Sequence, residues 1–264
     1  MHGRHRDLSL HEIEAVYYRR PGRHRMHPGL GEGDARWAGE EARAGFHGVL
    51  STLCSLWVNH PRHNAAAEVA PAALAAATRC GLPVPSTVIT NDLNEAREFV
   101  SALPGRVAAY KPLAAAGPVS HNGRVQAVWT SRVHADDLTE DVARTAHLFQ
   151  RWIDKAYEVR LTAVGNRHFA AEIHAGSAAS RIDFRRDYDS LTYRPCDVPK
   201  GIAEGVERLM AAFHLRYAAM DFLVDQDGDW HLVDVNPNGQ YGFIPDLRGP
   251  ITRALADLLE GPHR

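Results

Sequence analysis

Residues 217–243, YAAMDFLVDQDGDWHLVDVNPNGQYGF, are the most informative stretch of this chain. Tyr217–Val224 is apolar apart from one carboxylate, and Trp230–Val235 alternates apolar and polar residues. Between them lies Asp225–Asp229, an acidic turn around Gly228. Two extended runs joined by a short glycine-containing turn predict an antiparallel β-hairpin.

Three oxygen-bearing side chains of this hairpin are expected to converge. If the strands pair across the turn, Asp221 and Asp234 come to similar heights, and Asn236 lies on the same face as Asp234. Two carboxylates and an amide oxygen suit a hard cation such as Mg²⁺, which leaves positions for water and phosphate oxygens. The composition is equally compatible with an acidic hairpin followed by a plain turn, since Asp and Asn are ordinary turn residues.

Length and composition set the outer bounds. The chain has 264 residues, 45% hydrophobic and 23% charged, which suits one large domain or two or three small lobes. A formal charge of −2 gives no reason to expect nucleic acid or an anionic membrane as partner. The isolated cysteines Cys54, Cys80 and Cys196 fit a reducing cytosol better than a disulfide scaffold. We expect a cytoplasmic protein.

Hydrophobic periodicity predicts a mixture of helices and strands. Helices are expected within residues 32–53, 65–80, 92–103, 136–145, 202–213 and 251–259, and the first should bury Trp37, Phe46, Val49, Leu50 and Leu53. Strands are expected at 13–18, 56–58, 107–111, 125–130, 158–164 and 168–174, and residues 175–200 should form a long arginine-bearing loop. The first strand, helix and strand are too little for an independent α/β layer, so the chain is expected to start within a domain.

Three further segments carry weaker signals for an anion site. Lys111 closes a strand before the small-residue loop Ala114–Gly117, where its charge and the loop amides could reach a phosphate, although such a lysine is usually only solvated. Residues 150–153 could link two lobes and present backbone groups to an adenine edge. Arg181 and Arg185 could clamp phosphates or a carboxylate, and the alternative is a surface loop in which they pair with nearby aspartates.

The order of these pieces resembles the ATP-grasp superfamily, and within it the maturases of ribosomally made peptides (graspetide or microviridin-type macrocyclases), particularly the actinobacterial branch. The resembling stretches cover essentially the whole chain. They are VYYRRP (16–21), LWVNHP (56–61), VPSTVITN (84–91), YKPL (110–113), TAHLFQ (145–150), KAYEVRLT (155–162), AAEIHA (170–175) and NPNGQ (236–240).

The resemblance implies an α+β ATP-grasp fold, in which two α+β lobes grip ATP after a partial pre-ATP-grasp α/β segment. The expected parts are residues 1–61 for that segment, 62–149 for the small lobe with a linking helix, and 150–264 for the large lobe with the metal hairpin. The implied activity is that of an ATP-dependent carboxylate ligase, which forms ester or amide crosslinks in a precursor peptide through an acyl-phosphate. Its cofactors would be ATP and Mg²⁺, and its partners the leader and core of the precursor peptide, with a homodimer also compatible.

The resemblance also assigns residues to roles. Gln150 and Ile153 would contact adenine, Glu158 the ribose side, and Lys111 a phosphate; Arg160, Arg181 and Arg185 would contact the phosphate and acyl-phosphate region, and Asp221, Asp234 and Asn236 would hold Mg²⁺.

This sequence departs from the family pattern at several places. It enters at what look like the last strands of the pre-ATP-grasp domain, so a member truncated at its N-terminus is expected. Ala70 stands where relatives carry a phosphate-binding lysine, Asp234 replaces a glutamate, and Arg151 replaces the glutamate after the hinge glutamine. Two other readings stay open. One is a ligase that joins an amino acid or peptide to a carboxylate, and the other is a pseudoenzyme that binds nucleotide or leader peptide without turnover.

Overall fold

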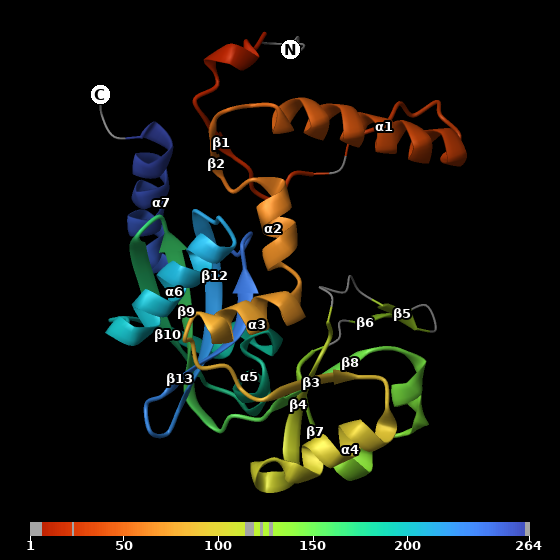
Figure 1. Ribbon diagram of the computed structural model, residues 1–264, viewed down its shortest axis with the longest axis vertical. Coiled ribbons are helices and arrows are strands. Elements are labelled where there is room, and N and C mark those ends of the chain that lie inside the picture. The colour runs from red at the N-terminus through yellow and green to blue at the C-terminus, as the bar shows by residue number, and fades with distance from the viewer. Residues whose placement is uncertain (1–6, 23, 114–118, 122–123, 127–128, 262–264) are drawn as a thin grey trace.

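The computed structural model describes residues 7–22, 24–113, 119–121, 124–126 and 129–261, and it shows helices packed around two antiparallel β-sheets (Figure 1). A short parallel pair of strands lies near the N-terminus. The fold class is therefore α+β, as the sequence predicted. Among the described residues, no helix is long and apolar enough to cross a membrane.

The larger sheet has five strands in the order β11-β10-β9-β12-β13, and every neighbouring pair is antiparallel. Their bounds are β9 (Lys155–Val164), β10 (Arg167–Ala175), β11 (Leu191–Cys196), β12 (Tyr217–Asp225) and β13 (Trp230–Asn236). The hairpin expected at 217–235 is thus confirmed as β12 and β13, and it forms one edge of this sheet. β9 lies at the centre because it pairs with both β10 and β12.

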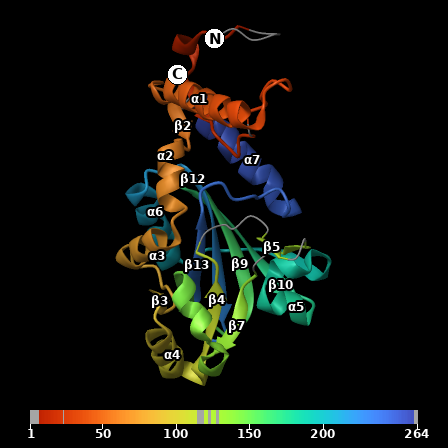
Figure 2. The same cartoon turned by 90° about the vertical axis from the view of Figure 1, so that its right-hand side faces the viewer.

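Two helices cover one face of this sheet. Helix α3 (Ala70–Arg79) and helix α6 (Lys200–Ala212) lie on the same side in Figure 2, and they share one buried core with the sheet. Val206 and Leu209 of α6 are fully buried in that core. Gly205 allows α6 to come close to its neighbour, since an added Cβ would lie only 2.6 Å from Cδ2 of Leu82. On the opposite face, Val164, Ala171 and Tyr217 belong to a second buried core, and the part of that face around Glu158 and Asp221 lines a site.

The smaller sheet has four strands in the order β3-β8-β4-β7. Their bounds are β3 (Thr87–Thr90), β4 (Val107–Lys111), β7 (Ser131–His134) and β8 (His147–Arg151). Between β4 and β7 the structure places a two-stranded pair, β5 (Val119–His121) and β6 (Arg124–Gln126), whereas the predicted loop 114–117 falls outside the described residues. The chain passes from the smaller sheet to the larger one between the end of β8 and the start of β9.

Helix α4 (Leu93–Ala102) packs on the smaller sheet. Its start is fixed by Asp92, whose Oδ1 accepts hydrogen bonds from the backbone N–H groups of Asn94 (2.8 Å) and Glu95 (2.9 Å). Ala96 and Val100 of α4 are fully buried. This helix agrees with the prediction because both its cap and its apolar face are local properties of the sequence.

The N-terminal part joins the larger sheet through a buried asparagine. It comprises β1 (Ala15–Tyr17), α1 (Glu32–Ser51), β2 (Leu56–Val58) and α2 (Pro61–Ala67), and the last helix, α7 (Pro245–Glu260), packs against it. The side chain of Asn59 donates to the carbonyl oxygen of Tyr217 (2.7 Å) and accepts from the Tyr217 N–H (3.0 Å). These bonds tie the start of β12 to the segment after β2.

Several predictions about the elements and their burial are wrong. The predicted helix at 65–80 is divided between α2 and α3, and the predicted strand at 125–130 overlaps only the end of β6, with β7 beginning after it. No residue of α1 is buried, and Trp37 is 65% exposed, because α1 lies apart from both sheets (Figure 1). The predicted helix at 136–145 is two short 3₁₀ helices, Ala135–Asp137 and Glu140–Arg144, which end where β8 begins to pair. The predicted loop 175–200 contains helix α5 (Ala178–Ile182), two 3₁₀ turns and the strand β11, which is an edge strand and therefore tolerates its proline.

Candidate active site

A cleft of about 930 Å³ lies between the two sheets. The ends of β4 and β8 form one wall, and β12 and β13 form the other. The link between the sheets and the segment 182–185 close one end, and residues around Ala70 and Asn238 close the other. The cleft is lined by Lys111, Gln150, Ile153, Glu158, Arg185, Asp221, Asp234 and Asn236, which are eight of the ten residues that the sequence assigned to the site.

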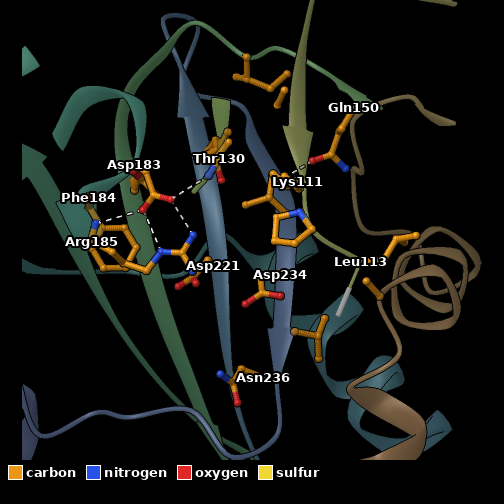
Figure 3. Close-up of a pocket in the computed structure, with 18 of the residues that line it drawn as sticks. Lys111, Leu113, Thr130, Gln150, Asp183, Phe184, Arg185, Asp221, Asp234 and Asn236 are labelled. Carbon is orange, nitrogen blue, oxygen red and sulfur yellow. Dashed lines mark hydrogen bonds and ion pairs between the residues drawn. The ribbon is translucent and has the colours of Figure 1, made fainter. Parts of the chain in front are cut away.

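Asp221 and Asp234 are direct cross-strand partners in the β12–β13 ladder. Their side chains project into the same space, and Asn236 follows two residues later on the same strand face (Figure 3). Enclosure in the cleft and the neighbouring Asp221 charge raise the pKa of Asp234. Two carboxylates held together against their mutual repulsion, with an amide oxygen beside them, are a donor set that fits Mg²⁺.

The third oxygen donor in this set is an amide rather than an acid. Among the described residues, no group of three or more His, Cys, Asp or Glu side chains is placed to hold a metal ion. Asn236 therefore completes the predicted set, and its Oδ1 also accepts a hydrogen bond from the Asn238 N–H (3.0 Å). A two-acid site of this kind leaves coordination positions that phosphate oxygens and water can fill.

Arg160 of β9 forms an ion pair with Asp221, one member of this acid pair. Its side chain is only 7% exposed, and its Nη1 donates to Oδ1 of Asp221 at 2.7 Å. Its Nη2 donates to the carbonyl oxygen of Gln240 (3.1 Å), so Arg160 joins β12 to the loop that follows β13. Arg160 is not among the residues that line the cleft. The structure thus places it behind Asp221, where it orients one carboxylate.

Lys111 approaches the acid pair from the smaller sheet (Figure 3). Its Nζ donates to Oε1 of Gln150 at 2.9 Å. Burial lowers the pKa of Lys111 to about 8, even though the charges of Asp234 and Glu158 act in the opposite direction. Because burial disfavours its charge, this cation is well placed to receive an anionic ligand.

Gln150 and Ile153 lie at the other end of the cleft, where the chain crosses between the sheets. Gln150 is 1% exposed, and both polar groups of its side chain already have partners. Its Oε1 accepts from Lys111, and its Nε2 donates to Oγ1 of Thr87 (2.9 Å). Contact with a ligand at this end would therefore come from backbone groups of the link, as the sequence suggested for an adenine edge.

Glu158 lies beside this link and has a partner that the sequence analysis missed. Its Oε1 accepts from Nζ of Lys155 at 2.6 Å, and both side chains are nearly buried. Burial raises the pKa of Glu158, and the Lys155 charge opposes that shift. Lys155 also lines the cleft. The stretch KAYEVRLT, which the resemblance quoted, was the available signal for it.

Arg185 reaches the cleft in a fixed orientation. Its Nε and Nη2 donate to the two carboxylate oxygens of Asp183 at 2.8 and 2.6 Å, and its guanidinium lies over the ring of Trp129. Burial alone would raise the pKa of Asp183, but the bonds from Arg185 outweigh it and lower that pKa. The predicted pairing with a nearby aspartate therefore coexists with a place in the cleft.

Arg181, by contrast, is exposed and is not among the described residues that line the cleft. The structure brings two other residues to the cleft instead, Arg20 from the N-terminal segment and Asn238 from the loop after β13. Ala70, where the resemblance implies a lysine, also lines it. Arg20 could have been found from the VYYRRP stretch, but only the tertiary structure shows that it lines the same cleft as β13.

Comparison with known proteins gives no match to a family model and no match among curated proteins. Solved structures do match. A Chryseobacterium gregarium RiPP-associated ATP-grasp ligase, in complex with ADP and a leader and core peptide, shares 26% identity at a TM-score of 0.88 over 98% of this chain and 80% of that one. Macrocyclase MdnC from Microcystis aeruginosa MRC, bound with precursor peptide MdnA, shares 27% sequence identity at a TM-score of 0.79, over 96% of this chain and 80% of that one.

The ATP-grasp ligase PsnB, complexed with a minimal precursor, is similar at a TM-score of 0.71 over 94% of this chain and 79% of that one, with 23% identity, which bears on the fold alone. The fold and the cleft together define an ATP-grasp ligase. Within that class, the chain is similar to a ligase associated with ribosomally synthesised and post-translationally modified peptides (RiPPs) and to a macrocyclase bound with its precursor peptide.

Proposed function

We propose that this protein uses ATP to join side-chain carboxylates of a precursor peptide to hydroxyl or amine side chains of the same peptide, which gives ester or amide crosslinks. The observation that carries the proposal is the cleft between the two sheets. Asp221 and Asp234 of the larger sheet and Lys111 of the smaller sheet line the same cleft. Two of the similar structures contain a precursor or a leader and core peptide, and one also contains ADP.

In the first step, a peptide carboxylate oxygen attacks the γ-phosphorus of ATP. The bond from that phosphorus to the bridging oxygen breaks, and ADP leaves an acyl-phosphate behind. Lys111 and Arg185 would stabilise the negative charge on the transferring group, because both present cations to the cleft near the acid pair. Mg²⁺ held by Asp221, Asp234 and Asn236 would neutralise phosphate charge in this cleft.

In the second step, a hydroxyl or amine of the peptide attacks the acyl carbon. Inorganic phosphate leaves and carries away the proton that the nucleophile gives up, so each crosslink removes the elements of one water from the peptide. The protein supplies no covalent nucleophile in this scheme. Its contribution is to hold the reacting groups together and to exclude competing water from the acyl-phosphate.

In this scheme each part of the chain would have its own role. Residues 62–149 would cover the nucleotide, residues 150–264 would provide the acid pair, and residues 1–61 would face the peptide. We place the reaction in the cytoplasm, where ATP and a newly made precursor are both present. Ala70 favours a second candidate, a nucleotide- or peptide-binding protein without turnover, because this position in the lining of the cleft lacks the phosphate-binding lysine that the resemblance implies.

The test is to incubate the protein with ATP, Mg²⁺ and a short Thr- and Asp/Glu-rich peptide encoded beside its gene, and to follow peptide mass and ADP. We expect loss of one water mass per ring, matched by one ADP. The Asp234→Asn variant is the matched control and should give neither product. Binding of ADP without any mass change, across several candidate peptides, would instead support the protein without turnover.

A further inference from the structure

A second cavity, of about 380 Å³, lies beside the loop that joins β13 to helix α7. Consecutive arginines separate it from the main cleft, because Arg20 lines the cleft and Arg19 lines this cavity. The loop is shared in the same way, with Asn238 in the cleft and Gln240 in the cavity. The two spaces are therefore neighbours on either side of one short loop.

This cavity is built to receive an anion. Arg19 and Arg248 both line it, and none of its described lining residues is acidic. Thr252 and Tyr241 add hydroxyl groups that can donate to an anion, although they contact each other in the structure at 3.3 Å. Two guanidinium groups without a competing carboxylate favour a ligand with paired oxygens.

The guanidinium of Arg19 is held in place yet incompletely paired. It lies over the ring of Tyr241 at 5.0 Å, and its Nη2 makes one long bond, 3.4 Å, to the carbonyl oxygen of Gly239. Its buried Nε has no hydrogen-bond partner within the described part of the chain. The ring of Tyr241 and a hydrogen bond with the hydroxyl of Tyr17 orient the guanidinium in advance. A carboxylate that pairs with its terminal nitrogens would therefore lose little free energy in ordering the side chain.

Arg248 completes the pair from the first turn of α7. Its Nε donates to the carbonyl oxygen of Gly242 (2.8 Å), which fixes the side chain over the cavity and leaves the terminal nitrogens for a ligand. The N-terminal end of α7 adds a favourable dipole for an anion. The volume of about 380 Å³ is near the lower limit of roughly 300–1,000 Å³ for small-ligand sites, so it suits a group of side-chain size better than a whole nucleotide.

The cavity is also coupled to the acid pair of the cleft. Gln240, which lines the cavity, accepts through its carbonyl oxygen from Nη2 of Arg160 (3.1 Å). Nη1 of the same arginine holds Asp221 at 2.7 Å. One buried side chain therefore connects the cavity wall to a proposed metal ligand, so an occupied cavity would fix the loop on which the cleft depends.

We propose that this cavity is a carboxylate subsite, which takes a non-reacting Asp or Glu side chain of the peptide whose reacting carboxylate lies in the cleft. The inference rests on the proposed function, because that function supplies an acidic peptide next to the loop. Anchoring one acid in the cavity sets the register of the peptide and selects which carboxylate reaches ATP.

The test uses small probes in place of the peptide. N-acetyl-glutamate methylamide is titrated into ¹⁵N-arginine-labelled protein, and the Nε–Hε resonances of Arg19 and Arg248 are followed. We expect saturable shifts of both, little effect of the neutral N-acetyl-glutamine methylamide, and a roughly tenfold or greater loss of affinity in Arg248→Gln, since a charge-assisted pair is lost. Arg253→Gln, an exposed α7 arginine outside the cavity, is the matched control and should bind like the wild type.

Each other outcome would overturn the proposal. Equal shifts with the glutamine probe would mean that charge is not recognised, and equal affinity of Arg248→Gln would place the probe elsewhere. Saturation by inorganic phosphate but not by the glutamate probe would make the cavity a phosphate site. ADP–Mg²⁺ binding, measured by calorimetry on the same samples, reports separately on the proposed function. If ADP–Mg²⁺ did not bind, the proposed function would be wrong, and the arginine shifts with the glutamate probe would still decide whether the cavity binds a carboxylate.

Discussion

The charge on Lys111 should control nucleotide affinity above neutral pH. Burial in the cleft lowers the pKa of Lys111 from 10.5 to about 8. A phosphate next to Nζ adds negative charge, so the pKa should rise again when nucleotide binds. Because the complex then holds a proton that the free protein loses above pH 8, affinity must fall as the pH rises through that value.

The size of this effect follows from the pKa. A group with a pKa of about 8 is about 90% charged at pH 7 and about 10% charged at pH 9. Affinity of the wild type for ADP–Mg²⁺ should therefore drop about tenfold over this interval, which equals about 1.4 kcal/mol. The phosphates of the nucleotide contribute little to the slope, since their last ionisation is largely complete above roughly pH 7.

Calorimetric titration of ADP–Mg²⁺ into the wild type, Lys111→Met and Lys111→Arg between pH 7 and 9 would measure this drop in affinity. Lys111→Met should bind weakly with little pH dependence, and Lys111→Arg, which stays charged, should also lose the pH dependence. A wild-type profile that is flat over this range, or a tenfold slope that persists in Lys111→Met, would refute the reasoning. In the first case Lys111 does not touch phosphate, and in the second another group titrates.

Stability without nucleotide provides an independent check on the same pKa. The folded protein binds fewer protons than the unfolded chain between about pH 8 and 10.5, so its stability should rise with pH across that window. Lys111→Met removes the cost of the buried charge and should stabilise the empty protein at pH 7 by about 1–2 kcal/mol, after allowance for water in the cleft. Urea unfolding of both proteins would measure this difference.

Three further variants test other parts of the site and fold. Asp234→Asn should abolish Mg²⁺-dependent ATP turnover and leave thermal unfolding unchanged or slightly higher, because a repelling charge is removed; retained turnover would exclude Asp234 as a metal ligand. Arg185→Lys should lower crosslink formation at least tenfold with ADP affinity nearly unchanged, since lysine cannot keep the two-oxygen bond to Asp183; parallel losses in both would instead indicate a ground-state contact. Asn59→Ala should cost about 2–4 kcal/mol in urea unfolding by leaving buried backbone groups of Tyr217 unpaired, and a loss below about 1 kcal/mol would show that water replaces the amide.

The errors in the sequence analysis have definite physical causes. The apolar positions of α1 were read correctly as one face, but periodicity says nothing of whether another element covers that face, and here none among the described residues buries it. Strand β11 was missed because Pro195 weakens any strand pattern, and only its position at the edge of the sheet makes the proline acceptable.

Sequence alone determined those features that depend on neighbours along the chain. The turn around Gly228 and the two-residue alternation fix the β12–β13 pairing from the turn as far as Phe222 and Leu232. Beyond that pair a bulge in β13 shifts the register, and this shift, which the sequence did not show, places Asp221 opposite Asp234. The cap at Asp92 likewise fixes the start of α4 without help from other elements.

Only the tertiary structure decided which distant groups meet at the site. Arg19 reaches Gly239 across 220 residues of chain, Lys111 faces the acid pair from another sheet, and Arg160 lies behind Asp221 rather than in the cleft. Such meetings depend on how sheets and loops pack together. That packing is a property of the whole chain, because the burial that drives it involves surfaces from many segments at once.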